Sequence, residues 1–577
     1  MDFMTPRLGR AKFFGLVMRT HLAKLGALAA ISGRPASAMR ARRAGRLTLA
    51  PQDIRTADPI TADEIYEGYF AFAGRSVNAG GRSPFALEPP SANWSATLHG
   101  FGWLRHLRAA DNMSSRATVS ALVIDWLERS GGGGFDRASA FTPAVVARRL
   151  LSWLSHSPVI LEGAGRTFYA RFTRSIGAHA ELLDNALREG LEGQARLTAI
   201  FALTQVGLCA ESAHRILRHA IRLMEQELPR QILADGGHIS RNPQALVELL
   251  LDLLPTRQAF AARTVSVPDV LEDAIARMIP MLLLFRHRDG ALAGFNGAGA
   301  SESGTLATLL AYSDPEAATR FVAPNSGYQR IEAGDSVLII DCGGPPPSAF
   351  SKEAHAGSLS LEFSSGLHQI LVNCGTPAFG GEAAKRQARS TAAHSTLVVD
   401  NMSSCSFVRA SGLATPTDGI ILDGPSRVVC RRDTELGRIR IEASHDGYAP
   451  RYRMIHRRVL WLDADGSCLV GQDRLEPLSQ ARAVRPVPFA ARFHLHPAVV
   501  ARQTESGGQI HLIAPSGEEW WFVADGHRID LEDSIYYAAP HKAHNARQLV
   551  IRGASDDDSI VSWSLARRDI KISPVCQ

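Results

Sequence analysis

The chain lacks the residue patterns of several well-known kinds of site. Its 577 residues hold only seven cysteines, and none belongs to a Cys-x-x-Cys pair, which excludes a zinc ribbon and a thioredoxin-like motif. Such scattered cysteines are expected to be buried as small hydrophobic side chains. The motifs Gly-x-x-x-x-Gly-Lys-[Ser/Thr], His-Glu-x-x-His and Gly-x-Ser-x-Gly are also absent. The sequence therefore indicates no P-loop, zincin or α/β-hydrolase site.

Long hydrophobic runs are missing too, and no segment has the quality of a signal peptide or a membrane span. Residues 1–47 form a basic leader with ten Lys or Arg and one acidic residue. Apolar residues recur at near-helical spacing between Phe13 and Leu28, which favours a surface helix or an otherwise unstructured leader. A weak membrane or export element and a nucleic-acid arm are the alternatives. The net charge of the whole chain is only +6, so a nucleic-acid partner is not expected.

Amphipathic helical patterns fill the first part of the chain and predict an all-α domain over residues 48–320. Several begin with proline at the first helical position, as at Pro143 and Pro243. Seven or more consecutive helices with short connections indicate a bundle, a solenoid or a toroid of helical hairpins. The expected helices cover residues 115–129, 143–154, 167–189, 194–209, 212–228, 243–255 and 268–287.

The hydrophobic period changes to strict alternation near residue 320, which predicts an antiparallel β-sandwich over residues 321–577. Short alternating segments are separated by Gly, Ser and Pro clusters, with almost no helical pattern between them. The fold class is therefore an α+β multidomain chain with the helical domain first. The expected strands cover residues 336–341, 358–363, 369–372, 395–400, 438–442, 458–462, 509–513, 519–523, 548–551 and 560–564.

Polar residues in loop settings mark the candidate sites. Segment 235–243 reads Asp-Gly-Gly-His-Ile-Ser-Arg-Asn-Pro and precedes an apolar helix; an arginine beside a helix N-terminus favours an anion. His355 and His394 each precede a predicted strand and are candidates for a base, an acid or a metal ligand. The alternative is that Asn242 only caps the helix and that the histidines are ordinary loop residues.

Together these segments resemble the heparinase II/III-like polysaccharide lyases, in which an incomplete α/α toroid precedes an antiparallel β-sandwich. The matching stretches occur in the family's order and span about residues 190–400. They are Asp235–Pro243, similar to Asp-Gly-Gly-His-x-Glu-Arg-Ser-Pro; Asp289–Gly297, similar to the end of the toroid; His355–Thr376, similar to the family's His-Ala-Asp-x-Leu-Ser-Phe and Val-Asp-x-Gly-Thr strands; and Arg389–Thr396, similar to Arg-Ser-Thr-x-Ala-His-Asn-Thr.

The resemblance implies β-elimination of an acidic, uronate-containing glycan in a cleft between toroid and β-sandwich. This reaction needs a group that neutralises the uronate carboxylate, a base for the C5 proton and an acid for the leaving oxygen. By resemblance, Arg241 and Gln194 are the candidate neutralisers, and His238 and His355 the candidate base and acid. Tyr328 is a candidate replacement for the family's phenol. The residues predicted to bind substrate are Gln194, Asn242, Glu353 and Tyr328.

Several positions at which the family has working groups are substituted here. The family's Tyr-His falls on Ala245-Leu246, the first His of its His-x-His on Glu353, and its zinc-binding Asp on Asn373. In relatives, histidines matching His355 and His394 share a structural zinc. The third ligand here would be Asn373, a neutral amide and a poorer zinc ligand than a carboxylate. We therefore expect the two histidines to lie close together, with zinc weak or absent and no cofactor required.

Two functions follow from the resemblance and its departures. The first is a polysaccharide lyase that acts on an acidic polysaccharide. The second is a catalytically silent protein that binds an acidic glycan on the same fold. The resemblance implies a location in the cell envelope or periplasm, and the cytoplasm is the alternative because the leader is a poor secretory signal.

Overall fold

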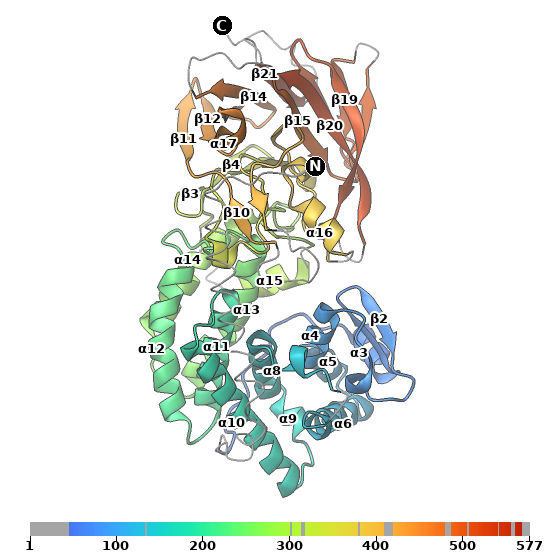
Figure 1. Ribbon diagram of the computed structural model, residues 1–577, viewed down its shortest axis with the longest axis vertical. Coiled ribbons are helices and arrows are strands. Elements are labelled where there is room, and N and C mark those ends of the chain that lie inside the picture. The colour runs from blue at the N-terminus through green and yellow to red at the C-terminus, as the bar shows by residue number, and fades with distance from the viewer. Residues whose placement is uncertain are drawn as a thin grey trace.

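The computed structural model describes residues 45–132, 135–300, 303–312, 318–378, 381–408, 419–478, 486–504, 507–539, 542–555 and 560–567. The predicted leader over residues 1–47 lies outside the described residues except for its last three. Figure 1 shows two regions, with sheets above and helices below. No helix within the described ranges is long and apolar enough to cross a membrane.

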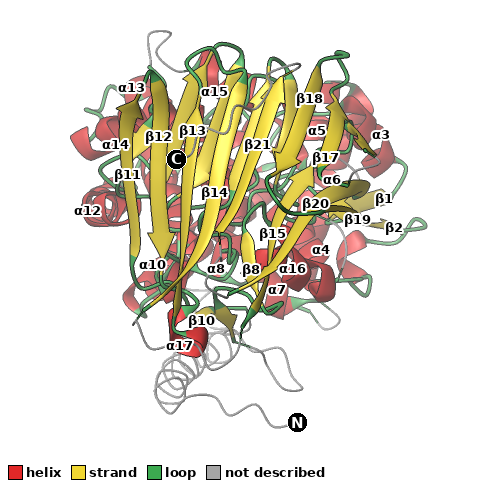
Figure 2. Cartoon of the chain, turned by 90° about the horizontal axis from the view of Figure 1, so that it is seen from above, coloured by secondary structure: helices red, strands yellow, loops and turns green. Residues whose placement is uncertain are grey.

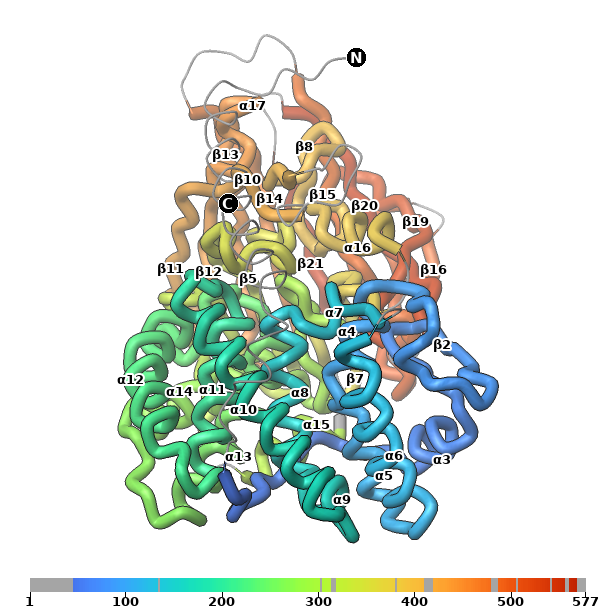
Figure 3. The backbone as a smooth tube through the Cα atoms, turned by 60° about the horizontal axis from the view of Figure 1, so that its bottom comes forward, coloured from blue at the N-terminus to red at the C-terminus, as the bar shows by residue number. Residues whose placement is uncertain are grey.

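Helices make up most of the described chain as far as residue 311. They follow one another around an arc, an incomplete α/α toroid (Figure 3). A hairpin of β1 (Tyr69–Phe72) and β2 (Arg75–Asn78) departs from the expected all-helical pattern and packs beside the first helices. The helices are α3 (Pro59–Tyr66), α4 (Ala92–Gly100), α5 (Leu104–Ala110), α6 (Met113–Arg129), α7 (Arg137–Ala140), α8 (Pro143–Ser155), α9 (Ser157–Ile160), α10 (Arg166–Arg188), α11 (Gln194–Cys209), α12 (His214–Gln231), α13 (Pro243–Ala262), α14 (Asp269–Phe285) and α15 (Ser303–Ala311), with a 3-10 turn η1 (Pro84–Ala86).

The strands from residue 322 onward are all paired antiparallel. They are β3 (Val322–Ala323), β4 (Tyr328–Ala333), β5 (Ser336–Asp341), β6 (Leu361–Ser365), β7 (His368–Val372), β8 (Leu397–Val399), β9 (Ser406–Phe407), β10 (Ile421–Asp423), β11 (Val428–Glu435), β12 (Arg438–His445), β13 (Met454–Leu462), β14 (Cys468–Pro477), β15 (Pro488–Leu495), β16 (Val500–Gln503), β17 (Gln509–Ile513), β18 (Glu519–Ala524), β19 (Ile529–Tyr536), β20 (His544–Ala554) and β21 (Ile560–Arg567). Short helical turns between them are η2 (Ser348–Phe350), α16 (Glu382–Ala388), η3 (Thr391–Ala393) and α17 (Ala449–Tyr452).

Two large sheets form the sandwich. The outer sheet has the order β11-β12-β13-β14-β21-β18-β17-β16, and Figure 2 looks onto its open face with the helices behind it. The inner sheet has the order β19-β20-β15-β7-β6-β5-β4-β3, with β8 paired to β15. Apolar side chains from both sheets form one core between them, so this region is the predicted antiparallel β-sandwich.

Strand β5 joins the sandwich to the toroid. Val337 and Ile339 pack in the hydrophobic core of the helical domain, whereas Leu338 and Ile340 pack in the core between the sheets. Alternate side chains of a strand point to opposite faces, and all residues of β5 are buried. The inner sheet is therefore covered on both faces here, which explains the continuous apolar run in its sequence.

Element boundaries follow local backbone chemistry. Helix α13 begins at Pro243 as predicted, and the Asn242 side chain accepts a hydrogen bond from the Gln244 backbone N at 2.9 Å. The strand predicted to start at residue 358 begins only at Leu361. Leu359 has a φ of +62°, a left-handed conformation that cannot continue a strand. The 358–360 segment therefore forms a turn.

Candidate functional site

The Asp235–Asn242 loop lies between toroid helices α12 and α13 and contacts the sandwich. The Asp235 carboxylate accepts hydrogen bonds from the backbone N of Asn325 at 2.8 Å and of Ser326 at 2.7 Å. It also accepts one from the Ser326 hydroxyl at 3.0 Å and one from the Gly237 backbone N at 3.0 Å. Asp235 therefore holds the segment just before β4 by hydrogen bonds, and its loop forms part of the domain junction.

Arg241 is buried at this junction. Its Nε donates to the Ser326 carbonyl at 2.7 Å, its Nη1 donates to the Gly344 carbonyl at 2.7 Å, and its Nη2 pairs with Asp341. Burial alone would lower the pKa of Arg241, but the adjacent Asp341 carboxylate outweighs it and raises that pKa. In this arrangement the guanidinium pairs with groups of the β-sandwich and so joins the two domains.

Tyr328 and Asn296 complete the same junction. The Tyr328 hydroxyl donates to the Arg241 carbonyl at 2.7 Å and accepts a hydrogen bond from Asn296 Nδ2 at 2.6 Å. Asn296 Nδ2 also donates to Asp341 Oδ2 at 3.0 Å. Tyr328 is fully buried, and burial raises the pKa of its phenol. The structure thus places this predicted phenol inside the protein, where its hydroxyl supports the Arg241 loop.

His238 lies under the same loop and is 2% exposed. Its Nδ1 is 2.7 Å from Ser240 Oγ, and its Nε2 is 3.0 Å from Gln231 Oε1. Burial lowers the pKa of His238 to about 3, so the ring is neutral at pH 7. Gln231 Nε2 donates to the Gly193 carbonyl at 3.1 Å, next to the partly exposed Gln194 at the start of α11. The structure therefore brings Gln194 and His238 to neighbouring positions, but only Gln194 is accessible to solvent.

His355 and His394 lie in direct contact in the sandwich. His355 Nδ1 is 2.9 Å from His394 Nε2, and His355 Nε2 is 3.0 Å from Thr376 Oγ1. His394 Nδ1 is 2.7 Å from the Ser390 carbonyl. Burial lowers the pKa of both rings, that of His394 to about 4. The charges of His394 and Arg389 lower the pKa of His355 further, whereas the hydrogen bond with the Ser390 carbonyl opposes the shift of His394. The predicted closeness of the pair is therefore present, in a buried setting that favours two neutral rings.

The residues around this pair do not fit a tetrahedral zinc site. Asn373 Oδ1 accepts a hydrogen bond from the Ser395 backbone N at 2.9 Å, and its Nδ2 donates to Glu362 at 3.0 Å. Glu353 is exposed in the preceding loop. A tetrahedral zinc ion needs four donors, and the predicted third ligand, Asn373, already has protein partners at both ends of its amide. Within the described ranges no group of three or more His, Cys, Asp or Glu has the arrangement of a metal site.

A cavity lies inside the toroid, away from these predicted residues. A cavity of about 460 Å³ is lined by residues of the 52–56 segment and of α4, α5, α8, α11, α13 and α15. None of its described lining residues comes from the β-sandwich. The volume lies in the range of small-molecule sites. This cavity lies within the helical domain, whereas the sequence predicts a site between toroid and sandwich.

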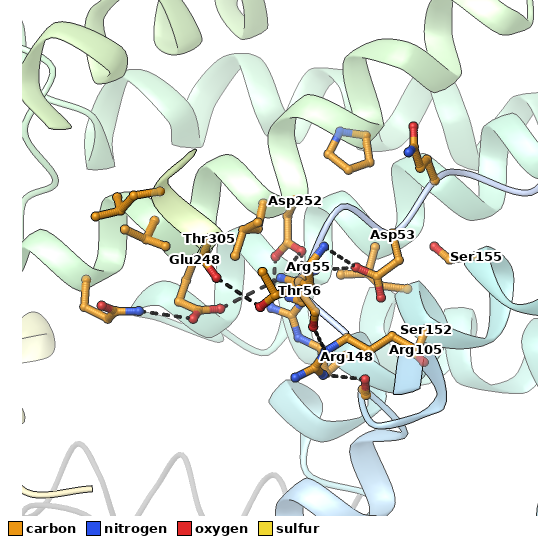
Figure 4. Close-up of a pocket in the computed structure, with 18 of the residues that line it drawn as sticks. Asp53, Arg55, Thr56, Arg105, Arg148, Ser152, Ser155, Glu248, Asp252 and Thr305 are labelled. Carbon is orange, nitrogen blue, oxygen red and sulfur yellow. Dashed lines mark hydrogen bonds and ion pairs between the residues drawn. The ribbon is translucent and has the colours of Figure 1, made fainter. Parts of the chain in front are cut away.

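Charged side chains of both signs meet in this toroid cavity (Figure 4). Arg148 Nη1 and Nη2 donate to the two oxygens of Asp252 at 2.7 and 2.9 Å, and Arg55 Nη2 donates to Asp252 Oδ1 at 2.7 Å. Burial alone would raise the pKa of Asp252, but the two guanidiniums lower it. With Arg105, Asp53 and Glu248 the lining holds three cations and three carboxylates.

Sequence reasoning missed this cavity, although helix α13 carried a signal for it. Gln244, Glu248 and Asp252 are spaced four residues apart and so lie on one face of an otherwise apolar helix. A polar stripe within a buried helix indicates a lined cavity or a polar partner. The partners, Arg55 and Arg148, are distant in sequence, and their side chains reach the stripe only in the folded toroid.

Comparisons with known proteins agree with this architecture. Residues 315–564 match the family model described as heparinase II/III-like, C-terminal. FtsZ-localized protein C of Caulobacter vibrioides is 28% identical over 538 residues, which cover 91% of this chain and 90% of that protein. A heparan sulfate lyase of Pedobacter heparinus aligns with a TM-score of 0.59 at 14% identity, over 90% of this chain and 84% of that one. A heparinase III structure aligns with a TM-score of 0.66 at 12% identity, over 96% and 90%.

The chain therefore has the fold of the heparinases, an incomplete toroid followed by an antiparallel β-sandwich. The match over the sandwich confirms the resemblance to the heparinase II/III-like polysaccharide lyases. At these identities the solved structures establish the fold and not the reaction.

Proposed function

We propose that this protein binds an acidic polysaccharide in the toroid cavity without cleaving it at the predicted catalytic residues. The observation that carries the proposal is the set of arginine and carboxylate side chains around the cavity of about 460 Å³. A glycan presents many hydroxyls, which need donors and acceptors side by side, and a uronate presents a carboxylate that matches the guanidinium fork. Arg148 makes a fork of this kind with Asp252, and its side chain is 28% exposed, whereas that of Arg241 is 7% exposed.

The predicted acid–base groups support binding better than cleavage. A lyase base must come within hydrogen-bond reach of the C5 proton. His238 and His355 are 2% and 4% exposed, and protein partners occupy both ring nitrogens of each. Arg241 and Tyr328 are committed to the domain junction. We propose that binding needs no metal, which the same titration repeated with EDTA will test.

Lyase activity is the second candidate, and the fold shared with heparan sulfate lyases over most of the chain favours it. One titration separates the two functions. The protein is mixed with heparan sulfate, chondroitin sulfate and polygalacturonate oligosaccharides, and both heat of binding and absorbance of the unsaturated uronate product are followed. Saturable heat without absorbance supports binding alone. Growth of absorbance shows elimination and contradicts the silent function.

Variants connect the binding to the toroid cavity. We expect Arg148→Met to weaken binding of the oligosaccharide that gives heat by tenfold or more, about 1.4 kcal/mol. The control is Arg188→Met, which removes an exposed arginine on α10 and should leave the affinity unchanged. Because the charges of the cavity balance, salt should change the affinity little, whereas binding by a basic arm would fall steeply. Equal affinity in both variants would exclude the cavity as the site.

The relative named FtsZ-localized protein C suggests where the protein acts. We propose that this chain also co-localises with FtsZ. A fluorescent fusion expressed in the native host, imaged together with labelled FtsZ, should give coincident signals. A signal spread evenly around the envelope or through the cytoplasm would contradict the proposal, and the same images decide between those two locations.

A further inference from the structure

Four charged side chains of the toroid cavity form a row in which the signs alternate. Arg148 donates to both oxygens of Asp252, at 2.7 and 2.9 Å. Asp252 Oδ1 also accepts from Arg55 Nη2 at 2.7 Å, and the same nitrogen lies 3.9 Å from Glu248 Oε2. The charge row therefore has the order Arg148, Asp252, Arg55, Glu248, and Figure 4 shows its members side by side at the cavity.

The two ends of the charge row are its most accessible members. The Glu248 side chain is 42% exposed and that of Arg148 is 28% exposed. The inner members are less exposed, Arg55 at 17% and Asp252 at 3%. The fork on Asp252 occupies two of the five N–H donors of Arg148. A ligand in the cavity thus meets a cation at one end of the row and a carboxylate at the other.

The contacts of Glu248 with other described residues are long. Its Oε2 lies 3.9 Å from Arg55 Nη2, and its Oε1 is 3.5 Å from Gln244 Nε2. Charge-assisted hydrogen bonds from a nitrogen to a carboxylate are typically about 2.7–2.9 Å long. The Glu248 carboxylate therefore keeps most of its capacity to accept hydrogen bonds from a ligand.

The spacing along helix α13 brings the two ends of the row within reach of one short oligosaccharide. Glu248 and Asp252 are four residues apart, a rise of about 6 Å along the helix, and Arg148 sits directly on Asp252. A glycan that carries only anionic groups would place negative charge beside Glu248. Like charges brought together in an interface weaken binding and act against the wrong partner.

We propose that the toroid cavity takes an acidic glycan that also carries a protonated amino group, as in a uronate-containing oligosaccharide with a free amino sugar. The uronate carboxylate binds Arg148, and the ammonium group binds Glu248. An ammonium group offers three N–H donors and a positive charge, which suit an accessible carboxylate better than a neutral hydroxyl does. This inference rests on the proposed function, since it names the kind of acidic glycan that the same cavity binds.

Two matched ligands test the proposal on the full chain at neutral pH. One is an unsulfated uronate–N-acetylglucosamine tetrasaccharide, and the other is the same compound after removal of its acetyl groups. We expect calorimetric titration to give a Kd about tenfold lower for the amine form, because only that form makes a charge-assisted bond with Glu248. Glu248→Gln should abolish this difference. The control Glu225→Gln removes an exposed carboxylate of α12 outside the cavity and should preserve it.

The possible results separate this inference from the proposed function. Equal Kd values for the two ligands, or a lower Kd for the acetylated one, would overturn the inference and leave acidic-glycan binding in place. A preference for the amine that persists in Glu248→Gln would also overturn it, because the ammonium group would then bind elsewhere. Heat from neither ligand would contradict both. If thermal unfolding shows that Glu248→Gln does not fold, the comparison of the two ligands on the wild-type chain still decides.

Discussion

Arg241 belongs to a motif that predicts ligand binding, but in the structure it makes buried contacts between the domains. Its φ of +60° and its bonds to Ser326, Gly344 and Asp341 place the guanidinium between the domains. We predict that Arg241→Met lowers the free energy of unfolding by about 3–5 kcal/mol, because Asp341 is left as a buried charge without its cation. Guanidinium chloride unfolding at pH 7 measures the change.

The control for this residue is Arg188→Met, which breaks an exposed pair with Asp184 and should cost less than about 1 kcal/mol. The double variant Arg241→Met/Asp341→Leu removes both buried charges and should recover part of the loss. Equal losses for Arg241→Met and Arg188→Met would show that the domain junction does not depend on this ion pair.

Among elements, the Asp235–Asn242 loop depends on a close approach to helix α14. Gly236 has a φ of +86°, and a Cβ there would lie 1.9 Å from the Arg277 carbonyl. We predict that Gly236→Ala destabilises the protein by about 2–4 kcal/mol, the sum of left-handed strain and overpacking. Gly163→Ala is the matched control, because Gly163 has a φ of +67° with nothing within 4 Å of its Cβ. Thermal unfolding of both variants measures the difference; if both lose the same amount, backbone strain alone explains it.

The elements also show what local sequence can and cannot predict. The cap at Asn242 and the start of α13 depend on adjacent residues, so pattern reasoning located them. The late start of β6 depends on the positive φ of Leu359. The alternation of apolar residues in the sequence does not predict this conformation. The polar stripe of Gln244, Glu248 and Asp252 was present in the sequence. Most other residues of this helix are apolar and buried, so the sequence pattern predicted a core helix and not a cavity wall.

For the whole molecule, the order of the domains was predictable and the toroid cavity was not. The change of hydrophobic period near residue 320 marks the domain order, because each helix and each strand buries one face and so shows the period of its own type. The toroid cavity needs Arg55 beside Asp252, 197 residues away, and Arg148, 104 residues from the same carboxylate. The motif residues lie at the domain junction instead. The Arg241 side chain contacts Ser326 and Asp341 of the sandwich, and Tyr328 on β4 donates to the Arg241 carbonyl, so both become interior groups.

Buried neutral histidines should make the stability of the whole molecule fall in acid. Burial lowers the pKa of His238 and His494 to about 3 and that of His394 to about 4, whereas the unfolded chain titrates near 6.5. Below that pH the unfolded state binds protons that the folded state refuses, so the free energy of unfolding decreases as the pH falls from about 6.5 toward 4. Each such histidine contributes up to about 1.4 kcal/mol per pH unit.

Denaturant unfolding at a series of pH values should show this slope, and His494→Gln should make it shallower by the share of one proton. His214→Gln, at an exposed position, should leave the slope unchanged; an unaltered slope in His494→Gln would mean that this ring is already protonated in the folded protein.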